Sequence, residues 1–220
     1  LKDLRQRLLL KDKRIGYPGN ADLPLDSYQK VNGSNQRAIM KKNLDILMIG
    51  HFAKDTIVVD GNSFNAAGGC INIYQSADME RRICKLNGFA GEIPLSDIPD
   101  VNAKIIMITP IIAGEITLPT LVALSKKAPV ALDVQGFVRV PEGDELNFRP
   151  WKDMEEGLKH VTFLKVDKAE AEHITGTEDL EKAARILADY GPKEIVLTQT
   201  KEVLVYADGK FFRAPFTPLN

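Results

Sequence analysis

Short, continuous apolar runs that alternate with helical stretches constrain the fold of this chain more than any other feature. Runs of this kind, bounded by turn residues, are typical of strands buried on both faces of a parallel sheet. One run follows Met40 and ends at Gly50, and others occupy residues 104–109, 130–133, 163–166 and 195–198. The helical stretches cover residues 116–127, 154–160, 168–175 and 179–190. This alternation predicts an α/β fold with right-handed crossovers and a mostly parallel sheet covered on both sides.

Each predicted strand ends in a polar residue or a turn, namely Gly50-His51, Thr109-Pro110, Asp133, Asp167 and Thr198. In open parallel sheets, ligands bind just beyond the carboxyl ends of the strands. We therefore expect the functional chemistry at that edge.

Two stretches, residues 56–62 and 71–86, break the alternation. Both predict short antiparallel strands with hairpin turns, and so a small β-flap beside the α/β core. The unpaired edges of such a flap favour a homodimer.

Composition excludes several classes of protein. The 29 basic residues nearly balance the 30 acidic ones, so the strong positive field that nucleic acids require is missing. All apolar runs are far shorter than the roughly 20 residues that cross a bilayer, and the first residues do not resemble a secretory signal. We expect a cytoplasmic protein with neither nucleic acid nor membrane as partner. Two cysteines, Cys70 and Cys84, are too few for a disulfide scaffold.

Residues 1–39 differ from the rest of the chain. Leu1, Leu4 and Leu8 fall at helical spacing, and a stretch rich in glycine, proline and asparagine follows them. We interpret residues 1–39 as an N-terminal appendage of unknown origin, and residues 40–220 as the main domain.

Two candidate substrate elements follow the first strand. Asp55 offers a carboxylate that could accept hydrogen bonds from sugar hydroxyls, although an exposed loop carboxylate would look the same. Gly68 and Gly69 permit close approach of the backbone to a ligand, and they equally suit an ordinary turn. Neither a GxGxxG fingerprint nor a GxxxxGK phosphate loop is present in the sequence.

The segment LKVDKAEAEHITG, residues 164–176, is the richest in polar groups. Lys165 and Asp167 stand at a strand end, and Glu170 falls on the first turn of the next helix. Asp167 as N-cap and Glu170 at the third helical position would form a capping box, which is a purely structural explanation. The functional alternative is that these groups organise water and Mg²⁺ around a phosphate chain. The three histidines, His51, His160 and His173, lack the spacing of a metal site.

Taken together, these segments resemble the ribokinase-like (PfkB) family of carbohydrate and nucleoside kinases, in its archaeal-type branch. The resemblance begins with DILMIGHFAKDTIVVDG and continues through Gly68-Gly69, ALDVQGFVRV, LKVDKAEAEHITG and EIVLTQTKEVLVYADGKFFRAPF. It implies a three-layer sandwich with a β-flap as lid, and ATP-dependent transfer of a phosphoryl group, with Mg²⁺, to a hydroxyl of a sugar or nucleoside. It also implies that Asp55, Gly68 and Gly69 bind the substrate. Lys165, Asp167, Glu170 and Thr198 would bind the nucleotide, with Glu170 reaching the metal through water.

Several features depart from the family pattern. Asp167 replaces the family's asparagine, and the glycines that usually follow the threonine are absent after Thr198. A segment is expected to be missing after Gly69, and the glycine-rich anion hole and catalytic aspartate would follow Asn220, so no catalytic residue is assigned in this chain. The alternative hypothesis is a shortened, non-catalytic relative that binds a small ligand or a partner.

Overall fold

The computed structural model describes residues 43–51, 53–59, 62–68, 86, 88–143 and 145–216, and for 53–59 and 62–68 it describes the backbone. All of these residues fall within one unit, Met40–Asn220. Residues 1–39, Gly69 and both cysteines lie outside the described residues, and so does the second predicted hairpin at 71–86 apart from Leu86. The interpretations of those parts stay predictions.

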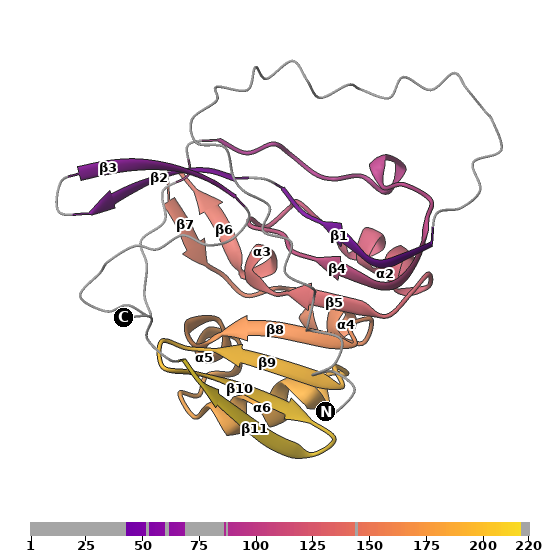
Figure 1. Ribbon diagram of the computed structural model, residues 1–220, viewed down its shortest axis with the longest axis vertical. Helices are drawn as coiled ribbons and strands as arrows, with labels where there is room; N and C mark the ends of the chain where they lie inside the picture. The colour runs from indigo at the N-terminus through magenta and orange to yellow at the C-terminus, as the bar shows by residue number, and fades with distance from the viewer. Residues whose placement is uncertain are drawn as a thin grey trace, which may run out of the picture. The chain divides into compact units, whose positions relative to one another are not determined.

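Seven strands form the central sheet in the order β1-β4-β5-β8-β9-β10-β11 (Figure 1). Five of them run parallel, and they are β1 (Asn43–Ile49), β4 (Asn102–Ile108), β5 (Val130–Asp133), β8 (Phe163–Asp167) and β9 (Glu194–Thr198). The last two, β10 (Glu202–Ala207) and β11 (Lys210–Pro215), continue the sheet in antiparallel pairing. The predicted parallel strands are confirmed.

Helices follow the strands as the crossover rule requires. They are α2 (Leu118–Ser125), α3 (Gln135–Val138), α4 (Met154–Leu158), α5 (Lys168–Thr175) and α6 (Leu180–Asp189), with a 3₁₀ turn at Leu95–Asp97. Helix α6 begins where Asp179 accepts hydrogen bonds from the amides of Glu181 and Lys182 at 2.9 and 3.1 Å. Such capping satisfies amides that have no partner inside the helix. No helix in the described part of the chain is long and apolar enough to span a bilayer.

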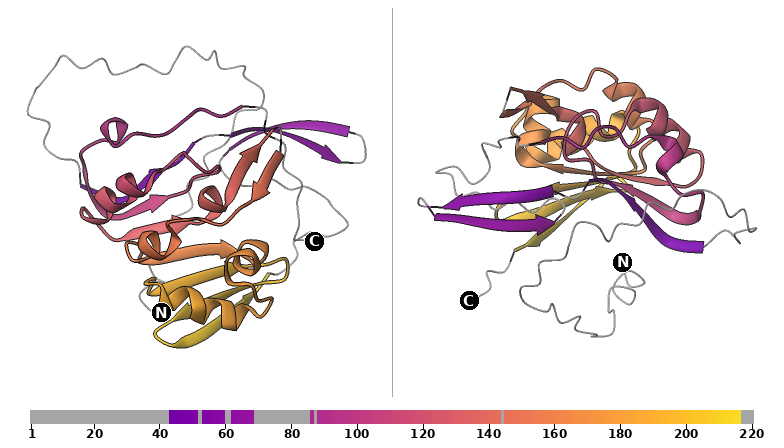
Figure 2. Two further views of the ribbon diagram at one scale, coloured as in Figure 1. Left: turned by 180° about the vertical axis from the view of Figure 1, so that it is seen from behind. Right: turned by 90° about the horizontal axis from the view of Figure 1, so that it is seen from above.

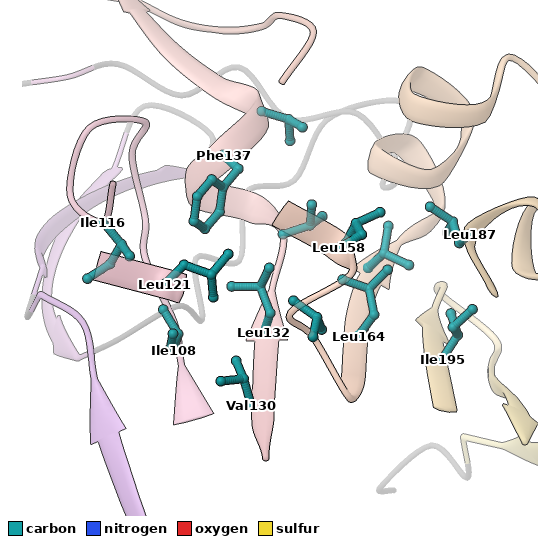
Figure 3. Packing of buried hydrophobic residues seen from close by; sticks show 14 of the residues in the cluster. Ile108, Ile116, Leu121, Val130, Leu132, Phe137, Leu158, Leu164, Leu187 and Ile195 are labelled. Carbon is teal, nitrogen blue, oxygen red and sulfur yellow. The ribbon is translucent and has the colours of Figure 1, made fainter. Parts of the chain in front are cut away.

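The hydrophobic core lies between the helices and one face of the sheet. Leu132, Leu164 and Ile195, from three neighbouring strands, are at most 1% exposed. They pack with Leu121 of α2 and Leu187 of α6 in one cluster (Figure 3). Because side chains alternate between the faces of a strand, every second residue of β5, β8 and β9 points into this cluster.

The described helices all lie over that one face (Figure 2). The sequence predicted cover on both faces, and within the residues that the structure describes the second face carries no helix. The second face is apolar at Ile105, Met107 and Ala131, which are partly exposed. Met48 of β1 is 65% exposed. Continuous apolar runs therefore do follow both faces of the strands, as the prediction assumed, but the described helices pack on only one.

Two small hairpins accompany the sheet. Strands β2 (Ala53–Val59) and β3 (Asn62–Gly68) pair antiparallel, which confirms the first predicted hairpin. The second hairpin, β6 (Arg139–Glu142) with β7 (Glu145–Phe148), was not predicted from the sequence. Its turn includes Gly143 at a φ of 65°, a left-handed conformation that glycine adopts without strain.

Candidate functional site

The polar ends of three adjacent strands meet at the carboxyl edge of the sheet. Asp133 of β5 is in register with Lys165 of β8, and Asp167 of β8 is in register with Thr198 of β9. Neighbouring strands lie about 4.8 Å apart, and Lys165 and Asp167 stand two residues apart on the same face of β8, so these four residues form a stepped row with Asp133 and Lys165 at one level and Asp167 and Thr198 at the next. The structure thus brings together Lys165, Asp167 and Thr198, which the sequence had placed near the nucleotide.

Lys165 and Asp133 form an ion pair within this row. The ammonium nitrogen of Lys165 lies 3.0 Å from one carboxylate oxygen of Asp133 and 3.3 Å from the other. Burial opposes the charge on Lys165, but the carboxylates of Asp133, Glu170 and Asp167 outweigh it and raise the pKa of the lysine. Lys165 is therefore a cation, and one third of its side chain remains exposed at the edge.

Asp167 and Glu170 form the capping box at the start of α5. The amide of Glu170 donates to Asp167 Oδ1 and the amide of Asp167 donates to Glu170 Oε2, both at 2.8 Å. The structural interpretation of this segment is therefore confirmed. Asp167 also keeps part of its carboxylate accessible, since its side chain is 19% exposed.

Arg139 joins the two carboxylates from the start of β6. Its Nη2 lies 3.2 Å from Glu170 Oε1 and 3.5 Å from Asp167 Oδ2. The sequence marks the segment that contains Arg139 by its family resemblance but indicates no partner for this residue. The only local signal was its place six residues after Asp133, beyond a strand end.

Glu170 is the most strongly perturbed group of the cluster. It is fully buried, and burial together with the charge of Asp167 raises its pKa to about 7, against the lowering effects of Lys165 and Arg139. A buried carboxyl next to another carboxylate resists ionisation for both reasons. With Glu170 protonated, Lys165 and Arg139 balance Asp133 and Asp167.

The residues predicted to bind substrate lie on the first hairpin. Asp55 of β2 pairs with Ala66, and Gly68 at the end of β3 pairs with Ala53. Both therefore lie toward the end of the hairpin that follows β1. Gly69 is outside the described residues.

A second polar group occupies the carboxyl ends of β1 and β4. His51 Nδ1 lies 3.4 Å from Oε2 of Glu115, and the rings of His51 and Phe89 meet edge to face at an interplanar angle of 69°. The sequence placed His51 at the polar end of the first strand but gave it no role or partner, and neither Glu115 nor Phe89 was singled out. A signal was present, because His51 and the loop before Glu115 each follow a parallel strand.

Within the described residues, no group of three or more His, Cys, Asp or Glu side chains has the geometry to hold a metal ion. Both oxygens of Glu170 already accept hydrogen bonds, and its side chain is fully buried. The carboxylate of Asp167 is more accessible to a metal ion than that of Glu170, because its side chain is 19% exposed.

Known proteins resemble this chain over much of its length. No family model matches it. A pyrophosphate-dependent kinase in the ribokinase family, solved with a pyrophosphate analog and myo-inositol, is 29% identical, with a TM-score of 0.69 over 78% of each chain. A pyrophosphate-dependent myo-inositol-1 kinase converted into a myo-inositol-3 kinase is 30% identical, with a TM-score of 0.70 over 78% of this chain and 76% of the other.

One curated protein is also similar. The cytidine kinase of Thermococcus kodakarensis is 35% identical over 131 residues, which are 59% of this chain and 44% of that protein. The match thus spans less than half the length of this relative. The fold predicted from the sequence, a mostly parallel sheet with helices and a small antiparallel hairpin, is the fold of these kinases. The chain is 30% identical to one of these solved kinases and covers more than two thirds of each of the two. The chain therefore belongs to the ribokinase family.

Proposed function

We propose that this chain forms the binding framework of a kinase that transfers a phosphoryl group to a hydroxyl of a small sugar, cyclitol or nucleoside. The observation that carries the proposal is the row of Lys165, Asp167 and Thr198 at the carboxyl edge of adjacent parallel strands. A partly exposed cation on one strand and a hydroxyl at the end of the next strand suit the phosphate chain of a donor, since phosphoryl transfer depends on positioning and on neutralising charge.

Each residue of the row has a role in this proposal. Lys165 is held by Asp133 and directs its remaining N–H groups to phosphate oxygens. Thr198 is a hydroxyl donor on the next strand. Arg139 offsets the negative charge of Asp167, which would otherwise repel the donor. The partly exposed carboxylate of Asp167 would hold a hydrated Mg²⁺ through water, and the bound ion would neutralise phosphate charge. We assign Glu170 to positioning Arg139.

The phosphate donor is ATP in this proposal. Two of the relatives above are described as pyrophosphate-dependent. Lys165 would contact the phosphates of either compound, so the test includes both. Asp55 and Gly68 on the β2–β3 hairpin, with Gly69, remain our proposal for contacts to the acceptor.

Donor binding to two lysine variants tests the proposal. Lys165→Met removes the cation at the carboxyl edge of the parallel strands. Lys210→Met makes the same change at an exposed lysine at the opposite, amino edge. Lys210 lies there because it pairs with Ala207, which in turn pairs with Glu194, the first residue of β9. Calorimetric titration with Mg-ATP and with pyrophosphate should show affinity weakened by about tenfold or more for Lys165→Met, and unchanged affinity for Lys210→Met.

Equal binding by Lys165→Met and the unsubstituted protein, with the fold intact by circular dichroism, would refute the assignment of the donor site. Donor and acceptor binding without turnover, in a protein whose intact mass matches 24.4 kDa, would favour the non-catalytic relative. Turnover with a sugar, myo-inositol or cytidine would favour the kinase.

A further inference from the structure

The chain leaving β1 is held tightly against the end of β4. The amide of Thr109 donates to the carbonyl of Ile49 at 2.8 Å. A Cβ on Gly50 would lie 2.4 Å from the carbonyl oxygen of Thr109, so only glycine permits this approach. His51 follows directly, and its place at the carboxyl edge of the sheet is therefore set by the backbone.

Glu115 reaches the same point from the loop after β4. Its side chain is 1% exposed, and Oε1 accepts hydrogen bonds from the amides of Ile111 at 3.0 Å and Ile112 at 2.9 Å. These bonds organise the loop and give Oε1 a structural role. Oε2 is buried without a hydrogen-bond partner, and Nδ1 of His51 stands 3.4 Å from it. A buried carboxylate oxygen without a donor is costly, and a proton on Nδ1 of His51, 3.4 Å away, would lower that cost.

The orientation of the imidazole has a chemical consequence. An Nδ1–H directed at Glu115 leaves Nε2 of a neutral ring as a hydrogen-bond acceptor. The side chain of His51 is 22% exposed. Glu115 would therefore determine which ring nitrogen is presented to a ligand.

Phe89 adds an apolar surface beside this acceptor. Its ring centroid lies 6.3 Å from that of His51 in an edge-on arrangement, and Phe89 is 44% exposed. The ring lies in van der Waals range of Gly114, where a Cβ would lie 3.7 Å from it, and the φ of 99° at Gly114 is what favours glycine there. An exposed aromatic ring next to one oriented polar group is a common composition for a small-molecule site.

We propose that His51 and Phe89 bind the acceptor of phosphoryl transfer, with Glu115 as the positioning residue. Nε2 of His51 accepts a hydrogen bond from a hydroxyl of a polyol or ribose, and Phe89 packs against the carbon skeleton. In the sheet order β1-β4-β5-β8, β1 is three strand spacings from β8, roughly 14 Å. The acceptor would thus bind on the same edge as the donor row. This inference rests on the proposed function, because it takes the ligand to be the hydroxyl-bearing acceptor.

Nitrogen-15 NMR of the histidines in the full chain tests the orientation of the ring. The chain has three histidines, so a spectrum of His51→Ala identifies the signals of His51. We expect a proton on Nδ1 in the unsubstituted protein. In Glu115→Gln the amide oxygen can keep the two backbone hydrogen bonds while its NH₂ faces Nδ1, and the ring proton should move to Nε2. A Glu115 that only organises the loop would leave the tautomer unchanged, which would overturn its role.

Ligand binding tests the site itself, with myo-inositol and cytidine as probes. We expect either probe to shift the Nε2 signal of His51, and the dissociation constant to rise about tenfold in His51→Ala. The matched control is His160→Ala, because His160 bonds Ser125 and Glu156 away from this edge. If Glu115→Gln does not fold, the spectra of the unsubstituted protein and of His51→Ala still show which nitrogen of His51 carries the proton and whether a probe shifts the Nε2 signal.

The outcomes separate the two proposals. Binding of a probe with unmoved His51 signals and unchanged affinity in His51→Ala would overturn this inference and leave the proposed function standing. Failure of both probes to bind would reject the inference for these acceptor classes and count against the proposed function, whose donor site is tested separately with Lys165→Met.

Discussion

Replacing Glu170 by glutamine should remove a pH dependence from the stability of the protein. Glu170 is fully buried, and Asp133, Lys165, Asp167 and Arg139 surround it. Burial and Asp167 raise its pKa from the usual 4.5 to about 7. In the unfolded chain the carboxyl group returns to its ordinary pKa, so between these two values the folded protein holds a proton that the unfolded chain has lost.

The sign and the size of the effect follow from linkage. Where the folded state binds more protons, the free energy of unfolding falls as pH rises. Each pH unit between the two pKa values is worth about 1.4 kcal/mol, so the contribution of Glu170 is fully present below pH 4.5 and about 3 kcal/mol is lost by pH 7. Above pH 7 the curve contributed by Glu170 should be flat.

Urea unfolding of the unsubstituted protein and of Glu170→Gln at pH 5, 6, 7 and 8 measures this difference. The fluorescence of Trp151, the single tryptophan, reports unfolding because its ring packs 4.3 Å from that of Phe137. The stability advantage of the unsubstituted protein over Glu170→Gln should shrink as pH rises to 7. Glu178→Gln, at an exposed site, controls for loss of a surface charge. An advantage that is constant from pH 5 to 8, or that grows with pH, would refute the reasoning.

Two further predictions concern the framework that carries the site. Gly136→Ala should destabilise the protein by about 3 kcal/mol or prevent folding, because its Cβ would lie 2.3 Å from Cβ of Pro110, whereas Gly88→Ala meets nothing within 4 Å. Thermal unfolding of the two variants compares them, and equal midpoints would contradict the packing argument. Asp179→Ala removes the N-cap of α6 and should cost about 1 kcal/mol in urea unfolding, while an unchanged midpoint would show that the cap contributes nothing.

The sequence alone was sufficient for the features that depend on near neighbours. Helix α5 has the predicted bounds, and the capping box of Asp167 and Glu170 forms as their spacing indicated. The parallel strands also appear where the apolar runs predicted them. The spacing of apolar residues, the helix caps and the residues that end strands each depend on a few neighbouring positions. They can therefore be recognised in the sequence without knowledge of the fold.

The row at the edge of the sheet was predictable in part. Strand ends of a parallel sheet share one edge, which placed Lys165, Asp167 and Thr198 together. The roles of these residues in binding remain proposals. The second hairpin, β6 with β7, was missed because its four-residue strands show little alternation, and the helices expected over the second face of the sheet are not found among the described residues.

The tertiary structure alone decided which distant side chains became partners. Arg139 meets Glu170 across 31 positions of the chain, and His51 meets Glu115 across 64. These pairs form because crossovers bring separate strand ends to one edge, and the register of each strand then determines which side chains come within a few ångströms of one another. Whether a carboxyl group is buried, and therefore whether its pKa rises as that of Glu170 does, depends on the same packing. The sequence thus determines where the polar groups emerge, and the folded sheet determines their partners and their charge.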